Sequence, residues 1–504
     1  MRKDFIALFA GALLPLAFSP YDFIPLAFIS LALLFYCWLD TTASGKRLFL
    51  RGFLFGVGLF GFGISWIFVS IHQYGGASIL VASIMTAALA SGLALFPALV
   101  GLMISYFSST SVLFRLTAVF PLIWMLVEWL RSWFLTGFTW LQVGNSQLDS
   151  PLVSLAPIFG VLGVGYAVSL ASGLIVGLFY SRGKKRGLLV ATLVGLLAVS
   201  FLLKPVSWTA PEGEPFSVTL IQGNIPQELK WERSVRQKTL QLYRRLTEEH
   251  WDSRLIIWPE TAIPAFYHQV KNGFLAELSE EARRHNSDLL IGVPVADQSS
   301  GQYYNAVASI GEKEGLYLKR HLVPFGEYLP LKPLSTFIAD QLQIPMSDFG
   351  AGSDDQLLLE AAGYPLAISI CYEDIFGEES RVGLPEARYL VNVTNDGWFG
   401  DTAAPHQHLQ MARMRAVEVG RYMLRATNTG ATAIIRPDGS IQSQAPFFKQ
   451  TTLSGDITAM KGVTPYVMWG DSFMVAFMFL QLIVVVFTGY VARQKMDRRL
   501  EKSR

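Results

Sequence analysis

Long apolar runs follow one another over the first 204 residues of the chain. Most of them approach the roughly 20 residues that an α-helix needs to cross the hydrocarbon core of a bilayer. An eighth run, Ser472 to Ala492, lies near the C-terminus. The sequence therefore predicts a polytopic α-helical membrane domain over 1–204 and a C-terminal span over 472–492, eight transmembrane helices in all. The first seven are predicted at 5–20, 22–39, 50–71, 77–107, 113–134, 153–180 and 186–203.

Composition excludes several classes of protein. Of the 504 residues, 51% are hydrophobic and 16% charged, whereas soluble proteins carry about 25% charged residues. The mean hydropathy of +0.36 excludes a purely soluble enzyme. A net charge of +2, without basic recognition helices or zinc-finger spacings, argues against nucleic-acid binding. Two distant cysteines, Cys37 and Cys371, exclude a disulfide framework.

The basic residues predict the orientation of the spans. They gather in alternate connections, around Arg2, Arg47, Arg115 and Lys184, and cytoplasmic loops are the basic ones. No clear small-x-small cleavage site follows the first apolar stretch, so we expect an uncleaved anchor. Seven spans place residue 205 onward on the outer face, and the basic tail 493–504 is expected in the cytoplasm.

Between residues 212 and 462 the composition is that of a soluble α/β domain. Short β-branched or apolar runs alternate there with amphipathic, charged stretches. Strands are predicted at 216–222, 254–258, 288–293, 303–309, 364–370, 388–394 and 431–436. Helices are predicted near 231–250, 272–286 and 404–420.

Three sites in this domain place a reactive side chain at the end of an apolar strand, where open α/β sheets usually bind ligands. Glu260 lies in IIWPETAIP, Lys319 and Glu327 in YLKRHLVPFGEYLP, and Cys371 in PLAISICYEDIF, just before Tyr372 and Glu373. Taken singly, each residue also has a purely structural interpretation. Glu260 could be an acid at the start of a helix, Lys319 a solvated lysine on an edge strand, and Cys371 an unreactive core cysteine.

Together, Glu260, Lys319 and Cys371 resemble the Glu–Lys–Cys triad of the nitrilase superfamily, in the same order along the chain. The resemblance extends over most of 216–457, through QGNIPQELKW, the YYNA run and VNVTNDGWFG. With membrane spans before and after this domain, the whole chain resembles the membrane-bound apolipoprotein N-acyltransferases. LVPFGEYLP and TNDGWFG make the match specific within the superfamily.

The resemblance implies an αββα sandwich and ping-pong acyl transfer. Cys371 is then the nucleophile, Glu260 the general base and Lys319 the oxyanion stabiliser, with Glu327, Tyr372 and Glu373 in support. Substrate contacts are expected at Trp231, Asn305, Trp398 and Phe399.

The implied partners are a phospholipid acyl donor, a diacylglyceryl apolipoprotein acceptor and the lipid bilayer. The implied location is the bacterial inner membrane, with the catalytic domain on the periplasmic face. The protein is expected to be a monomer that needs no metal or other cofactor.

Two other functions remain open from the residues alone. A membrane-anchored amidase would use the same triad with water as the second nucleophile. A transporter with an outer binding domain would need more ionisable residues within the spans.

His406 and His408, two residues apart, do not form a metal-ligand set. Glu128 and Arg131 are expected to form a structural pair.

Overall fold

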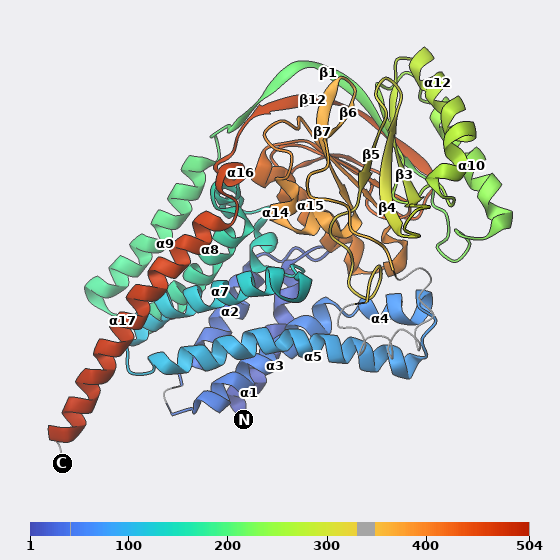
Figure 1. Ribbon diagram of the computed structural model, residues 1–504. Helices are drawn as coiled ribbons and strands as arrows, with labels where there is room; N and C mark the ends of the chain where they lie inside the picture. Colours follow the sequence, from blue (N-terminus) through green and yellow to red (C-terminus); the bar gives the residue numbers. More distant parts are fainter. Residues whose placement is uncertain (41, 330–347, 503–504) are drawn as a thin grey trace. The chain divides into compact units, whose positions relative to one another are not determined.

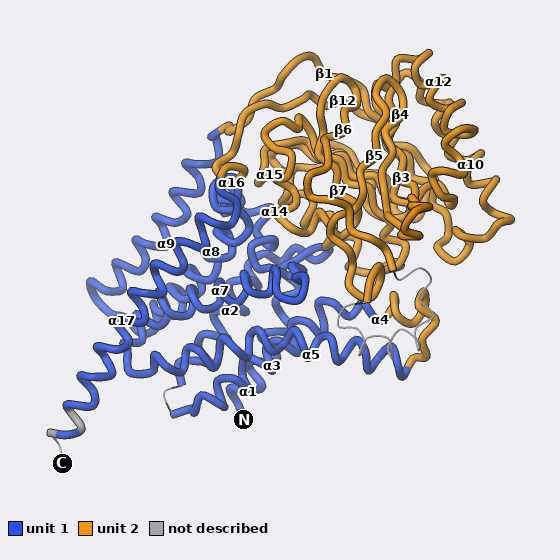
Figure 2. The backbone as a smooth tube through the Cα atoms, viewed as in Figure 1, with its two compact units in different colours: residues 1–67, 80–206, 469–504 blue, residues 68–79, 207–468 orange. Residues whose placement is uncertain are grey.

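The computed structural model describes residues 1–40, 42–329 and 348–502 (Figure 1). The chain forms two compact units, coloured separately in Figure 2. The first comprises residues 1–67, 80–206 and 469–504, and the second comprises residues 68–79 and 207–468. Segment 68–79, which connects two helices of the apolar N-terminal part, thus belongs by its contacts to the second unit.

The first unit is helical. Its longer helices are α1 (Arg2–Leu13), α2 (Pro25–Trp38), α3 (Gly45–Gly63), α5 (Ile79–Ile104), α7 (Phe120–Trp133), α8 (Ala156–Phe179), α9 (Gly183–Leu203) and α17 (Ser472–Lys502). The short α6 (Val112–Phe114) also belongs to this unit, whereas α4 (Ile67–Val69) belongs to the second unit except for Ile67. Among the described residues, five helical stretches are long and apolar enough to cross a membrane, or six if one bent pair forms a single span.

The predicted spans differ from these helices at the N-terminus. α1 and α2 have 12 and 14 residues, short of a full crossing, so the count of eight stays a prediction. The third predicted span, 50–71, is not one straight helix, because α3 ends at Gly63 and the chain bends by 59° before the helical stretch 67–74. Glycine is a poor helix former, and the run GFG at 61–63 weakens the helix at this point.

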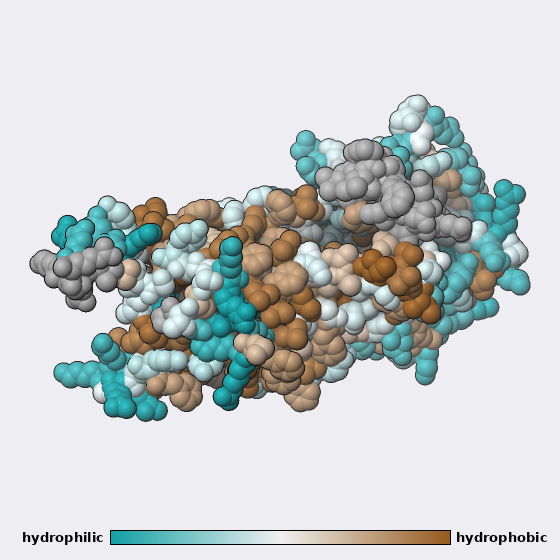
Figure 3. Space-filling view, turned by 90° about the horizontal axis from the view of Figure 1, so that it is seen from below, coloured by the Kyte–Doolittle hydropathy of each residue, from teal (hydrophilic) through white to brown (hydrophobic). Residues whose placement is uncertain are grey.

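The surface of the first unit is unusually apolar. Only 11% of the most apolar part of α9 is buried. In α17, the side chains of Leu480 and Ile483 are each about two-thirds exposed. Figure 3 shows brown, apolar residues over a broad area of the molecular surface seen from below. Soluble monomers rarely expose continuous patches of this kind. These helices are therefore those of a membrane protein.

Glu128 and Arg131 form the expected structural pair. Both side chains are buried in the first unit, with Arg131 Nη2 3.8 Å from Glu128 Oε1. Arg131 Nη1 also donates to the carbonyls of Phe138 and Trp140 at 2.6 and 2.7 Å, and the Val143 N–H donates to Glu128. The pair therefore ties α7 to the segment that follows it.

The second unit contains two six-stranded sheets, in the orders β12-β1-β2-β3-β4-β5 and β11-β10-β9-β8-β7-β6. The first sheet is formed by β1 (Thr209–Gln222), β2 (Leu255–Ile257), β3 (Asp288–Ala296), β4 (Tyr303–Ile310), β5 (Gly315–Leu318) and β12 (Thr451–Gly462). The second is formed by β6 (Leu359–Ala361), β7 (Tyr364–Ile370), β8 (Leu390–Thr394), β9 (Met423–Thr427), β10 (Ala433–Ile435) and β11 (Ile441–Gln444). Helices α10 (Arg233–Glu248), α11 (Tyr267–Val270), α12 (Ala276–Arg284), α14 (Gly377–Ser380), α15 (Ala403–Val419) and α16 (Pro465–Trp469) complete the unit.

The sheets pack face to face in an αββα sandwich. Val218 and Ile257 of the first sheet share one buried core with Ile368 and Val391 of the second. A separate core joins the other face of the first sheet to α10 and α12 (Figure 1), and a third joins the second sheet to α15. The sandwich expected from the resemblance is therefore present.

The predicted strands and helices of this domain were confirmed, but five strands were missed. β5 and β6 have only four and three residues, and β9 contains the charged Arg425. β11 and β12 are largely polar, and β12 is recognisable only by its antiparallel pairing with β1. Their positions depend on partner strands distant in sequence rather than on a local pattern.

Candidate functional site

The three predicted catalytic residues lie just after strands β2, β5 and β7. Glu260 comes three residues after β2, while Lys319 and Cys371 directly follow β5 and β7. Strand β3 runs parallel to β2, and β5 returns to that direction through the antiparallel β4, so the ends of β2 and β5 lie at one edge of their sheet. The fold thus gathers side chains that are 59 and 52 residues apart in sequence.

Glu260 is placed by close backbone packing. The Trp258 N–H donates to the Leu290 carbonyl at 2.8 Å, which continues the strand pairing past β2. A Cβ atom at Gly292 would lie 2.7 Å from Glu260 Cα, so only glycine lets the two backbones approach this closely. Burial raises the pKa of the Glu260 carboxyl, against the opposing charge of Lys319. A carboxylate with a raised pKa is a stronger proton acceptor.

Lys319 is fully buried and paired. Its Nζ lies 2.8 Å from the Glu327 carboxylate, and its backbone N–H donates to the Asn305 carbonyl at 2.8 Å. Burial alone would lower the pKa of Lys319, but the charges of Glu327, Cys371 and Glu260 outweigh it and raise the pKa. Lys319 is therefore a permanent cation at the site.

Asn305 connects the two carboxylates. Its Nδ2 donates to Glu260 Oε1 at 2.6 Å and to Glu327 Oε1 at 3.3 Å. Glu327 Oε2 also accepts from the Val323 N–H at 2.8 Å, which holds the loop after β5. The structure therefore brings Glu260, Asn305, Lys319 and Glu327 into one hydrogen-bonded group.

Cys371 occupies a tight turn between β7 and the 3₁₀-helix Cys371–Ile375. Its φ of +52° lies in the left-handed region, which costs a non-glycine residue about 1–2 kcal/mol. Such local strain often marks a functional position. Burial, and then the charge of Glu260, raise the pKa of the Cys371 thiol, while Lys319 lowers it. The resting side chain is therefore a thiol that needs a base to become a nucleophile.

Glu373 joins the cysteine turn to the lysine loop. Its buried carboxylate accepts from the backbone N–H groups of Ile370 at 2.6 Å, Arg320 at 2.6 Å and His321 at 3.1 Å. The Tyr317 hydroxyl donates to it at 3.1 Å. Glu373 thus ties the backbone before Cys371 to the backbone after Lys319. The Tyr372 ring packs on Phe376, with ring centroids 5.1 Å apart, and the proposed oxyanion role of its backbone N–H stays a prediction.

Of the predicted substrate-contacting aromatics, Trp231 lies in a turn, and Trp398 and Phe399 lie in the short 3₁₀-helix Asp396–Phe399. Trp231 and Trp398 are 43% and 37% exposed, and Phe399 is half-buried. The Ser70 hydroxyl donates to the Trp398 carbonyl at 2.7 Å, and the Tyr74 and Trp398 rings are 6.2 Å apart. Segment 68–79 therefore contacts the loop that carries Trp398, but contact of these aromatics with substrate stays a prediction.

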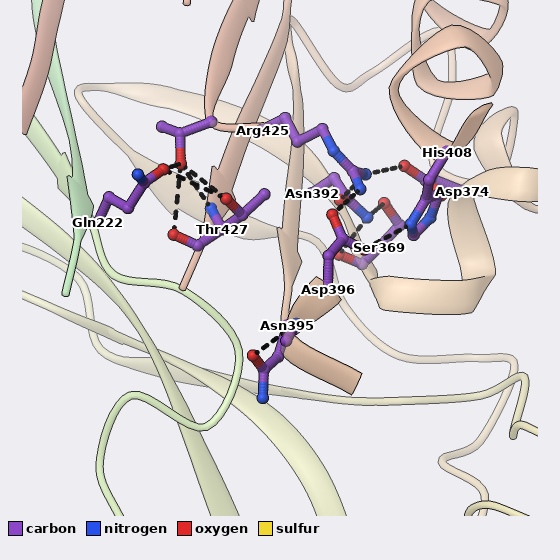
Figure 4. A network of polar contacts seen from close by, with 11 residues as sticks. Gln222, Ser369, Asp374, Asn392, Asn395, Asp396, His408, Arg425 and Thr427 are labelled. Carbon is purple, nitrogen blue, oxygen red and sulfur yellow. Dashed lines mark hydrogen bonds and ion pairs between the residues drawn. The ribbon is translucent and has the colours of Figure 1, made fainter. Parts of the chain in front are cut away.

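Sequence reasoning missed a buried ionic network beside Cys371 (Figure 4). The two ring nitrogens of His408 contact Asp374 at 2.7 Å and Asp396 at 2.9 Å. Arg425 donates to the same two carboxylates at 2.7 and 3.1 Å, and to Asn392 at 2.6 Å. The network joins the turn after β7 to the loop after β8. In the part of the chain that the structure describes, no cluster of histidine, cysteine and carboxylate side chains could hold a metal ion.

Sequence reasoning also missed a second buried lysine, Lys230. Its Nζ donates to the Glu260 backbone carbonyl at 3.2 Å, and the residue is 4% exposed. Lys230 lies within the segment QGNIPQELKW, which is part of the resemblance to the nitrilase superfamily. A lysine inside a motif otherwise rich in polar residues gives no local signal of burial.

Solved structures of the nitrilase superfamily are similar to about half of the chain. A carbon-nitrogen hydrolase superfamily protein from Xanthomonas campestris is 19% identical, covering 49% of this chain and 92% of its own, with a TM-score of 0.38. A nitrilase superfamily member from Saccharomyces cerevisiae is 17% identical, covering 53% and 97%, with a TM-score of 0.37.

The carbon-nitrogen hydrolase family model matches residues 217–465, so the second unit is a domain of that class. The model of the apolipoprotein N-acyltransferase N-terminal domain matches residues 10–174. Proteins named apolipoprotein N-acyltransferase from Methylococcus capsulatus and Nitrosomonas europaea are 53% and 43% identical to the chain. They cover 94% and 97% of it, over 93% and 98% of their own lengths. The chain belongs to the apolipoprotein N-acyltransferase family.

Proposed function

We propose that this protein transfers a fatty acyl chain from a phospholipid to the α-amine of the N-terminal diacylglyceryl-cysteine of an apolipoprotein, through a thioester on Cys371. The observation that carries the proposal is a strained, partly buried cysteine whose thiol interacts electrostatically with Glu260 and Lys319. A nucleophile, a base and a permanent cation are the groups that acyl transfer requires. Membership of the family supports these substrates.

In the first half-reaction, Glu260 accepts the thiol proton as Cys371 sulfur attacks an ester carbonyl of the phospholipid. The carbonyl oxygen becomes an oxyanion, which Lys319 and the Tyr372 backbone N–H stabilise. The C–O bond to the glycerol oxygen then breaks, and that oxygen takes the proton from Glu260. The products are the Cys371 thioester and a lysophospholipid.

In the second half-reaction, the α-amine of the acceptor attacks the thioester carbonyl. Glu260 accepts a proton from the amine, the C–S bond breaks, and Glu260 returns the proton to the Cys371 sulfur. Glu327 holds Lys319 in place through both half-reactions by its 2.8 Å ion pair. The lipid substrates contact three aromatic residues at the edge of the active site, Trp231, Trp398 and Phe399.

The proposal includes the setting of the reaction. The chain crosses the bacterial inner membrane eight times as a monomer, with the catalytic unit on the periplasmic face and the basic tail in the cytoplasm. The exposed apolar surface of the first unit supports the bilayer as a partner. Both substrates are lipid-anchored and reach Cys371 from that bilayer, and neither nucleic acid nor a cofactor takes part. The last two tail residues, Ser503 and Arg504, lie outside the described residues.

Intact-protein mass spectrometry tests the first half-reaction. We expect wild-type protein incubated with phospholipid vesicles to gain the mass of one acyl chain, and the Cys371→Ser variant to gain none. Peptide mapping should place the acyl group on Cys371. An unmodified wild-type protein would refute the thioester.

The choice of acceptor separates acyl transfer from hydrolysis. The acyl-enzyme is isolated and mixed with a diacylglyceryl-cysteine peptide that has either a free or an acetylated α-amine. We expect N-acylated peptide only with the free amine, and slow release of free fatty acid in its absence. Equally fast release of fatty acid with either peptide would identify a hydrolase instead.

A further inference from the structure

The described structure contains one more cation beside the proposed base and nucleophile. Lys230 lies in the loop between β1 and α10, and its Nζ donates to the Glu260 backbone carbonyl at 3.2 Å. A neutral carbonyl compensates a buried ammonium poorly, because desolvation costs a charge more than one hydrogen bond returns. The position of Lys230 therefore needs an additional electrostatic reason.

The loop that carries Lys230 is held in place by two asparagines. The Asn428 side chain accepts from the Ile225 N–H at 3.0 Å and donates to the Ile225 carbonyl at 2.8 Å. The Asn395 amide donates to Gln227 Oε1 at 2.7 Å. The loop is therefore hydrogen-bonded to the residues that directly follow β8 and β9, and these contacts hold the backbone that carries Lys230.

The charges around the nucleophile show what Lys230 supplies. Glu260, Glu327, Glu373, Asp374 and Asp396 are the nearby acids. Glu373 is compensated by backbone N–H groups, and the two aspartates by Arg425 and His408. Glu260 and Glu327 remain, and Lys319 balances only one of them. Lys230 is the second cation that makes this group neutral.

Electrostatic interactions connect Lys230 to both reacting groups. Burial lowers the pKa of Lys230 to about 8, while the charges of Glu260 and Cys371 oppose that decrease. By reciprocity, an ammonium at this position favours the anionic forms of Glu260 and Cys371. Its effect is largest when the thiol proton leaves, because Lys319 is already paired with Glu327.

We propose that Lys230 is a positioning residue whose ammonium holds the Glu260 backbone and stabilises the Cys371 thiolate as it forms. The inference rests on the Cys371 and Glu260 assignments of the proposed function, but on neither acyl substrate. It assigns distinct tasks to the two lysines. Lys319 stabilises the oxyanion, and Lys230 stabilises the sulfur anion.

Alkylation of Cys371 measures thiolate formation without any lipid substrate. The full-length protein carrying Cys37→Ser is treated with iodoacetamide between pH 6 and 10, and the rate of modification of Cys371 is followed by mass spectrometry. We expect Lys230→Met to slow alkylation at pH 7 about tenfold and to move the profile about one pH unit upward. Lys230→Arg should keep most of the rate. The exposed Lys238→Met, on α10, should match the parent.

A structural role for Lys230 would give a different pattern. Lys230→Gln keeps a hydrogen-bond donor without the charge, so it should shift the profile as Lys230→Met does. A wild-type profile in folded Lys230→Gln would overturn the inference, as would equal impairment of Lys230→Arg and Lys230→Gln. Should Lys230→Met not fold, the Arg and Gln pair decides alone.

The same experiment separates the inference from the proposed function. A shifted alkylation profile together with absent wild-type acyl-enzyme would refute acyl transfer and leave the role of Lys230 intact. Wild-type acyl-enzyme together with unshifted alkylation in the Lys230 variants would refute only the role of Lys230.

Discussion

The side-chain nitrogen of Asn305 lies 2.6 Å from Glu260 Oε1. The same nitrogen is 3.3 Å from Glu327 Oε1, so one amide group donates to both carboxylates. Its Oδ1 is buried without a hydrogen-bond partner among the described residues. We expect this oxygen to accept a hydrogen bond from the substrate amine. Asn305 is then both a spacer between two acids and a substrate contact.

Replacing Asn305 by alanine should leave a smaller fraction of Glu260 ionised at neutral pH. The Asn305 hydrogen bond lowers the pKa of Glu260, so its loss raises that pKa further. Because Glu260 must be ionised to accept the thiol proton, the low-pH limb of acyl-enzyme formation should move to higher pH. A hydrogen bond to a charged group is worth about 1.5–3 kcal/mol, so the rate at neutral pH should fall about tenfold or more. The exposed Asn272→Ala serves as control, and an unchanged limb would contradict the prediction.

Cys371→Ser should abolish turnover, because a carboxylate base generates an alkoxide far less readily than a thiolate. We expect less than a few per cent of wild-type activity in a lipopeptide N-acylation assay. Cys37→Ser is the matched control, since Cys37 is buried in the first unit. Its loss of activity would show that the nucleophile has been misassigned.

Glu373→Gln should affect both stability and chemistry. The amide NH₂ group would face a backbone N–H of Ile370, Arg320 or His321, and a buried unpaired donor costs about 1–3 kcal/mol. We expect a Tm lower by roughly 2–10 °C and slower acylation of Cys371. Glu378→Gln, in the exposed pair with Arg381, should change the Tm little. Similar melting curves for both variants would argue against a bridging role of Glu373.

The ionic network predicts a pH-dependent stability. Burial and Arg425 lower the pKa of His408, but Asp374 and Asp396 outweigh them and the pKa rises above 6.5. The stabilisation is therefore complete below pH 6.5 and is lost as pH rises through the folded-state pKa. Burial raises the pKa of Asp396, but Arg425 and His408 lower it below 3.8 overall. Its contribution is accordingly present above pH 3.8 and is lost in stronger acid.

Thermal melts of His408→Gln should reveal this dependence. The loss of Tm relative to wild type should be largest near pH 6 and shrink toward alkaline pH. The exposed His268→Gln provides the control. A Tm difference that stayed constant from pH 5 to 9 would mean that His408 contributes through packing rather than through its charge.

The proposed orientation can be tested in intact spheroplasts. A membrane-impermeant thiol reagent should label a cysteine at the exposed Ser300 but not one at Lys495, whose basic surroundings are expected in the cytoplasm. Both probes should react after the membrane is permeabilised. Reversed labelling would separate Cys371 from the periplasmic acceptor and refute the proposed reaction.

Local sequence patterns were enough to predict the two parts of this protein and its candidate catalytic residues. Apolar runs of membrane length and the alternation of strands with amphipathic helices predicted two unlike parts. Glu260 and Cys371 could be selected because each follows a predicted strand within two residues, and Lys319 because it lies in the motif YLKRHLVPFGEYLP. The order of these motifs along the chain was sufficient for the resemblance to the nitrilase superfamily.

Tertiary structure decided what surrounds those residues. Lys230 and His408 lie in polar stretches, and their burial depends on contacts with Glu260 and Asp374, 30 and 34 residues away. β12 exists only through pairing with β1, and the bend after α3 interrupts an apolar run that reads as continuous. The physical reason is the same in each case. Hydropathy and turn preferences act between near neighbours, whereas the pairing of buried charges and strands depends on which distant segments the fold brings together.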